Sequence, residues 1–243
     1  MGDSGIRRAI VEKLKSLYPG VYNEDNIGLV GTHQHAGVGG FLENLLPQLT
    51  SLGFVRETFD AIVAGTVKAA VQAHNNLGPG SLSYGTTDPL DWSQDIVFPI
   101  SRPAYLANPA EERAKYAYDQ DKTMTLVKFK GDSGDKGFLS FFPVHGTSLY
   151  QNNTLVSTDN KGMAAYLYEN FVEPNAAPGN TSFVAGFVQA SLSLTIVEPT
   201  ARVLDNLGMG NNVNSTTLPV ATIHKFVVTS QKHDIRISLT FLS

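Results

Sequence analysis

Two histidines separated by one residue are the most chemically suggestive feature of the sequence. His33 and His35 lie in the glycine-rich segment 31–40, GTHQHAGVGG. In an extended segment, side chains two residues apart project to the same side, so both imidazoles could reach one site. A neutral imidazole is a natural zinc ligand, and a neighbouring imidazole could exchange protons with metal-bound water. The glycines would let the backbone approach an ion or a substrate closely.

This pattern alone leaves three interpretations open. The first is a metal or catalytic site, the second is a pair of structural histidines in a turn, and the third is a loop that cradles a phosphate. His145 follows a predicted strand and could complete the pair in space. Considered alone, a histidine in such a place is more often a core residue with its hydrogen bonds satisfied.

The elements that must position these histidines follow from the spacing of apolar residues. Repeats of three or four positions predict helices, and short apolar runs that end at turn residues predict strands. The predicted helices cover 4–17, a segment that begins after Gly40, 56–74 and 159–171. The predicted strands cover 26–32, 124–130, 137–144 and 183–190, with a hairpin turn at 131–136. The stretch 77–103 is dense in Gly, Pro, Ser and Asp and is predicted to be irregular.

This succession of strands, loops and helices predicts an α/β fold, a mixed sheet layered with helices. In such folds, ligands favour the carboxyl ends of the strands. The loop 32–40 is therefore expected at a functional edge of the sheet.

Composition excludes several classes of function. The chain has 243 residues, of which 42% are apolar, which is ample for a globular core. Its net charge is −4 with scattered Lys and Arg, so no nucleic-acid footprint is present. No apolar run approaches the roughly 20 residues of a membrane-spanning helix. Cysteine is absent, which leaves histidines and carboxylates as the metal ligands.

Glycosylation sequons occur at Asn152, Asn180 and Asn214, by chance or because the protein is secreted.

Five segments, in chain order, resemble the neutral/alkaline (non-lysosomal) ceramidases. They are MGD at 1–3, LVGTHQHAGVGG at 29–40, SLGF at 51–54, AYLANPAEER at 104–113 and DNKG at 159–162. The resemblance covers residues 1–190 and implies an N-terminal, incomplete part of a ceramidase catalytic domain. Residues 191–243 form a divergent tail.

The resemblance implies roles for individual residues. His33 and His145 correspond to zinc ligands, and His35 to a catalytic histidine beside the metal that helps position substrate or water. Arg102 lies near an arginine that binds substrate in the family, but its flanking residues are shifted, and a solvated loop arginine is the alternative. Asp159 and the residue after it could line the site or cap their helix.

The implied activity is zinc-dependent hydrolysis of the amide bond of ceramide to sphingosine and a fatty acid. Zinc would polarise the carbonyl group and lower the pKa of its bound water toward about 7. The implied partners are ceramide and other sphingolipids, with a membrane surface as the source of substrate. The family further implies the secretory pathway, the cell exterior or the cell surface.

The sequence also departs from the family. The family's Gly-Asp-x-Ser-Pro-Asn segment, which carries a catalytic serine, is replaced here by SLSLTIVEP at 191–199. Its remaining zinc ligands, a glutamate and a tyrosine, belong to a region beyond residue 243. We expect that the tail is read out of frame and that the chain is truncated at both ends. We therefore also expect poor solubility, weak or absent zinc binding and no detectable ceramide hydrolysis. The alternatives are a catalytically dead fragment that binds lipid or a partner, and a different metallohydrolase.

Overall fold

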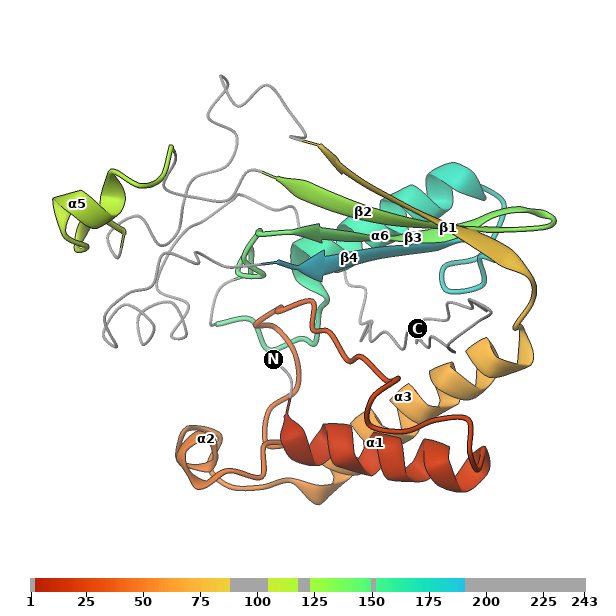
Figure 1. The fold of residues 1–243 in the computed structure, drawn as a ribbon. Coiled ribbons are helices and arrows are strands. Elements are labelled where there is room, and N and C mark those ends of the chain that lie inside the picture. Colours follow the sequence, from red (N-terminus) through yellow and green to blue (C-terminus); the bar gives the residue numbers. More distant parts are fainter. Residues whose placement is uncertain (1–2, 88–104, 118–122, 150–151, 191–243) are drawn as a thin grey trace.

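The computed structural model describes residues 3–87, 105–117, 123–149 and 152–190 (Figure 1). The helices are α1 (Ser4–Leu17), α2 (Leu45–Thr50), α3 (Arg56–Asn75), α5 (Ala110–Arg113) and α6 (Asp159–Val172). The strands are β1 (Gly80–Thr87), β2 (Met124–Gly131), β3 (Gly134–Phe142) and β4 (Val184–Gln189). The predicted α/β fold with a mixed sheet is confirmed.

The sheet has the strand order β1-β2-β3-β4. The first two neighbouring pairs are antiparallel, and β2 and β3 form a hairpin in which Gly131 pairs with Gly134. Strands β3 and β4 are parallel and are connected through α6. Because Phe142 pairs with Gln189, both strands end at the same edge of the sheet. The chain that follows β3 therefore starts beside the end of β4.

Apolar side chains cover both faces of the sheet. On one face, Phe138 packs with Phe183 and Ala185, and its ring meets Tyr168 of α6 edge-on with 4.8 Å between ring centroids. On the other face, the buried cluster consists of Phe129, Leu139 and Val188. Helix α6 therefore lies over one face and is anchored there by an aromatic contact.

Helices α1 and α3 form a second layer, below the sheet in the view of Figure 1. Asp3 caps α1 because its carboxylate accepts a hydrogen bond from the backbone N–H of Ile6 at 3.0 Å. Apolar residues at helical spacing then bury one face of each helix against the other. The buried positions are Ile6, Ile10, Val11 and Leu14 in α1 and Phe59, Ile62, Val63 and Ala70 in α3.

One predicted strand is absent from the structure, and one observed strand was not predicted. Segment 26–32 contains only an isolated bridge position at Gly28, because Ile27 and Leu29 instead pack against the α1 and α3 cluster. Residues 80–87 were predicted to be irregular but form β1, which pairs with β2 along its length. The side chains of residues 80–86 are exposed, so no alternation of apolar and polar residues marked this strand. The remainder of that stretch, 88–103, and the tail 191–243 lie outside the described residues.

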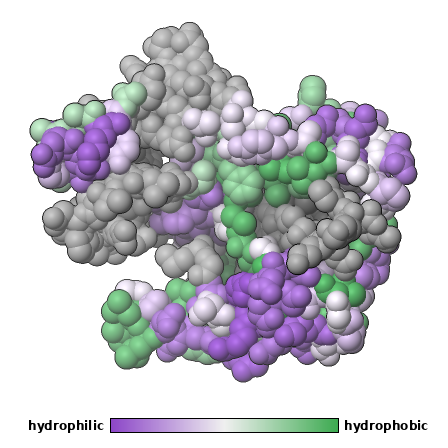
Figure 2. All heavy atoms as spheres, viewed as in Figure 1, coloured by the Kyte–Doolittle hydropathy of each residue, from purple (hydrophilic) through white to green (hydrophobic). Residues whose placement is uncertain are grey.

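The surface over α2 is conspicuously apolar. Figure 2 shows hydrophobic residues gathered there, at the lower left of the view. Leu45, Leu46 and Leu49 of this helix are exposed, as is Leu52 in the turn that follows. In the part of the chain that is described, no helix combines the length and apolar character needed to cross a bilayer.

Candidate metal centre

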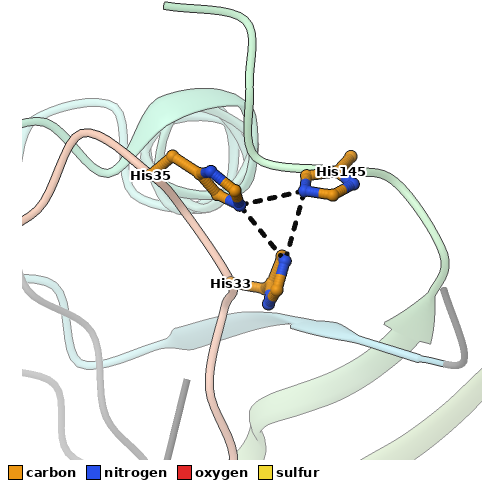
Figure 3. A group of neighbouring side chains, drawn as sticks. All are labelled: His33, His35 and His145. Carbon is orange, nitrogen blue, oxygen red and sulfur yellow. Dashed lines mark hydrogen bonds between the residues drawn. The ribbon is translucent and has the colours of Figure 1, made fainter. Parts of the chain in front are cut away.

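Three imidazoles converge at the edge where β3 and β4 end (Figure 3). The Nε2 atom of His33 is 3.2 Å from that of His145 and 3.2 Å from that of His35. The Nε2 atoms of His35 and His145 are 2.9 Å apart. His145 is buried, His33 is half-buried and His35 is exposed. The three rings thus point one nitrogen each toward a common centre that opens to solvent on the His35 side.

His33 and His35 do not meet by the alternation of an extended strand. The backbone of His33 has φ 60°, in the left-handed region that non-glycine residues seldom adopt. The loop is tied down on both sides of this turn, because the Gly31 carbonyl accepts from the Gln189 N–H at 3.4 Å and the Ala36 carbonyl accepts from Ser157 at 2.9 Å. The structure does bring the two rings together, but not through the side-chain alternation of an extended segment.

His145 reaches the pair through a close approach of two backbone segments. Gln34 and Gly146 form a parallel bridge, and the His35 N–H donates to the Gly146 carbonyl at 2.9 Å. A Cβ atom on Gly146 would lie 2.5 Å from the Cα of Gln34 and 2.6 Å from the His33 carbonyl oxygen. Only glycine fits at this position, and its absence of a side chain allows the histidine-bearing segments to touch.

The loop after β3 is held from the other side by the start of α6. The Asn160 side-chain amide donates to the His145 carbonyl at 2.7 Å, and the Asp159 carboxylate accepts from the backbone N–H of Ser148 and Leu149, each at 3.2 Å. The Lys161 ammonium donates to the Val144 carbonyl and, at 2.6 Å, to the Gln189 side chain. Burial lowers the pKa of Lys161 to about 8, and the nearby Asp159 carboxylate opposes this shift. Asp159 and Asn160 thus contact the loop that carries His145, and the Asp159 carboxylate also accepts from the Asn160 N–H of its own helix at 2.6 Å.

The three nitrogens fit a tetrahedral metal ion. Two ligands of one zinc ion at about 2.0–2.1 Å, at tetrahedral angles, are about 3.3–3.4 Å apart. The observed separations of 2.9–3.2 Å are slightly below this range. Among the described residues, these histidines are the group that could hold a metal. Imidazole donors suit zinc, copper and nickel.

Other buried polar atoms lie in the same segments. The Oε1 atom of Gln34, the Oγ1 atom of Thr147 and the Oδ1 atom of Asn160 have no hydrogen-bond partner within the ranges that the structure covers. Buried polar groups are nearly always satisfied, and exceptions often mark functional sites. These atoms belong to residues within two positions of a histidine of the cluster or to Asn160 of α6, which contacts the His145 carbonyl. Polar groups thus gather at this edge of the sheet.

The structure brings together three of the four site residues that the sequence suggested. His33, His35 and His145 form the cluster, whereas Arg102 lies outside the described residues. Sequence reasoning missed Gly146 and Lys161. A glycine directly after a candidate ligand was a usable signal for the first, whereas the second is revealed only by contacts across the fold.

Comparisons with known proteins agree with this site. A family model described as "Neutral/alkaline non-lysosomal ceramidase, N-terminal" matches residues 1–197. The neutral ceramidase of Oryza sativa subsp. japonica is 41% identical over 217 residues, which are 89% of this chain and 27% of the relative. The neutral ceramidase of Drosophila melanogaster is 37% identical over 189 residues, which are 77% of this chain and 26% of that relative.

A solved structure matches as well. The neutral ceramidase from Pseudomonas aeruginosa superposes with a TM-score of 0.65 at 35% identity, covering 78% of this chain and 28% of the other. A structure described as "Ceramidase complexed with C2" gives the same TM-score at 36% identity, covering 77% of this chain and 28% of that chain. The chain thus spans about a quarter of the length of the relatives that it matches.

Proposed function

Because the chain belongs to the neutral/alkaline non-lysosomal ceramidase family, we propose that it carries the histidine part of a zinc site that hydrolyses the amide bond of ceramide. The products would be sphingosine and a fatty acid. The observation that carries this proposal is the convergence of the Nε2 atoms of His33, His35 and His145 within 3.2 Å of one another. Membership of the family supports the choice of ceramide as the substrate, and the histidine cluster supports the location of the site.

We assign different roles to the three histidines. His33 and the buried His145 would hold the ion, since their segments are fixed by backbone contacts on both sides of the centre. When bound, zinc would polarise the substrate carbonyl and lower the pKa of bound water toward about 7. The exposed His35 faces the open side, where it can donate a hydrogen bond to the substrate carbonyl or carry a proton to the leaving amine.

The substrate contact and the cellular setting are also proposals. Arg102, which lies outside the described residues, would contact ceramide. One solved relative is described as complexed with C2. A membrane surface would supply the lipid. Asn152 and Asn180 are exposed, as glycosylation requires, which supports the secretory route. A mobility shift on enzymatic deglycosylation, after expression through a eukaryotic secretory pathway, would test this route.

The sequence supplies imidazoles but not the family's serine motif, so we expect ceramide turnover to be undetectable. The test is a zinc titration of the 243-residue chain, with hydrolysis of a short-chain fluorescent ceramide measured in parallel. Zinc bound at one ion per chain and lost in His33→Ala would support the site. An absence of zinc binding in a folded chain would refute it, and turnover of another amide or ester alone would reassign the substrate.

A further inference from the structure

We propose that three consecutive residues at the start of α6, Asp159, Asn160 and Lys161, are positioning residues that aim His145 at the other two histidines. This inference rests on the metal centre proposed above. Thr158 occupies the cap position of α6 without a side-chain cap hydrogen bond, and the Asp159 carboxylate accepts from the Asn160 N–H at 2.6 Å. All three side chains also contact the backbone of the loop that carries His145.

Asn160 makes the most direct contact. Its amide donates to the His145 carbonyl at 2.7 Å and to the Ser148 hydroxyl at 3.2 Å. The carbonyl is part of the peptide plane between His145 and Gly146, so this bond fixes the plane that also presents the Gly146 backbone to the segment of His33. A single side chain thus sets the orientation of His145 and the contact between the two segments.

Asp159 holds the far end of the same loop. Its two carboxylate oxygens accept from the backbone N–H groups of Ser148 and Leu149, each at 3.2 Å. The residue is buried and has φ 53°, a left-handed conformation that costs roughly 1–3 kcal/mol for a side-chain-bearing residue. Burial of a carboxylate without hydrogen-bond partners would be costly. The N–H groups of Ser148 and Leu149, together with that of Asn160 at 2.6 Å, therefore stabilise Asp159 in this conformation.

Lys161 holds the near end. Its ammonium joins the Val144 carbonyl, which directly precedes His145, to the Gln189 side chain at the end of β4. The Gln189 backbone N–H in turn donates to Gly31, which begins the loop of His33 and His35. Lys161, which is buried, therefore links the segment of His145 to the segment of His33 and His35 through Gln189 at the end of β4.

The opposite end of α6 offers a matched control. There the Glu173 carboxylate accepts from Ser182 N–H at 3.0 Å, from its hydroxyl at 2.6 Å and from Phe183 N–H at 2.9 Å. These bonds tie α6 to the start of β4, away from the strand ends that carry the histidines. Glu173→Ala and Asn160→Ala both remove side-chain hydrogen bonds of α6, but only the second touches the metal centre.

The experiment compares zinc affinity, measured by competition with a chromophoric chelator, in the wild-type chain and in Asn160→Ala, Asn160→Asp and Glu173→Ala. Groups that orient a ligating histidine typically contribute 10–100-fold to metal affinity. We expect this loss in both Asn160 variants, including Asn160→Asp, which keeps the side-chain size and lacks the donor. Glu173→Ala should lower the melting temperature of the metal-free chain and leave zinc affinity within about threefold.

Cobalt absorption provides a second readout, because its visible bands report the coordination geometry. Altered cobalt bands in folded Asn160→Asp, with unaltered bands in Glu173→Ala, would support positioning. Wild-type affinity in the Asn160 variants, or a loss of affinity in all variants that merely follows their melting temperatures, would overturn it. A folded wild-type chain that binds neither zinc nor cobalt would overturn the metal centre itself, and the positioning role with it.

Discussion

Replacement of Gly146 by alanine is the sharpest test of the histidine cluster, because it changes no candidate ligand. The new Cβ would lie 2.5 Å from the Cα of Gln34 and 2.9 Å from its backbone nitrogen. Both neighbours are backbone atoms, so no flexible side chain can move out of the way. The parallel bridge between Gln34 and Gly146 must therefore open.

The size of the effect follows from these distances. Carbon atoms in contact prefer about 3.5–4.0 Å, so the two segments must separate by about 1 Å or more. The Nε2 atoms of His33 and His145, now 3.2 Å apart, would then lie beyond the roughly 3.4 Å that two ligands of one zinc ion allow. Loss of ligand alignment on this scale should lower zinc affinity at least about 10–100-fold, or about 1.4–2.7 kcal/mol.

The assay is again competition with a chromophoric chelator, with Gly39→Ala as the matched control. Gly39 lies in the same histidine loop, and a Cβ atom there would meet nothing within 4 Å. Gly39→Ala should bind zinc like the wild-type chain. Equal zinc affinity in Gly146→Ala and the wild-type chain would show that the close approach of the two segments does not build the metal centre.

Three further predictions concern stability and association. The pKa of Lys161 in the folded chain is about 8, below its ordinary value of 10.5. Between about pH 8 and pH 10.5 the unfolded chain therefore binds more protons than the folded chain, and the free energy of unfolding should rise with pH by up to about 3 kcal/mol. The free energy of unfolding in urea should show this rise from pH 8 to pH 10 in the wild-type chain and not in Lys161→Met. An equal rise in both chains would refute the assignment of the lowered pKa to Lys161. Burial, partly opposed by hydrogen bonds and reinforced by the charge of Glu173, raises the pKa of Glu169, so Glu169→Gln should be more stable than the wild-type chain at pH 7. This advantage should vanish below about pH 4.5 in thermal melts, where both states of the wild-type carboxyl are protonated, and an advantage that persists there would need another cause. Leu45 and Leu49 are 74% and 66% exposed, so the double variant Leu45→Ser, Leu49→Ser should self-associate less than the wild-type chain in light scattering. Unchanged scattering would show that this surface does not drive association.

The sequence predicted the helices well because their signal is local. The buried positions of α1 and α3 recur at helical spacing, and the bounds of α1 and α3 differ from the predicted ones by at most one residue. Strands were harder to predict, because their signal depends on what each face touches. The exposed β1 had no apolar face to reveal it, and the apolar run at 26–32 packs against helices instead of entering a sheet.

The candidate site shows the same division. His33 and His35 are close in sequence and could be recognised as a pair, whereas His145 lies 110 residues after His35 and joins them only through the parallel end of the sheet. The contacts of Lys161 span 17 and 28 residues. No periodicity reports such distances, so the positions of these side chains depended on the fold.

The left-handed backbone of His33 shows how fold and site depend on each other. In an extended conformation, the alternation of side chains would place both rings on one side, but the observed turn at φ 60° brings them together by another route. A conformation of this kind costs roughly 1–3 kcal/mol and persists only where its surroundings enforce it. The enforcing contacts come from Gln189 at the end of β4, Gly146 after β3 and Ser157 before α6. Because these contacts come from three different parts of the chain, a substitution that weakens any one of them should change the relative positions of the three histidines.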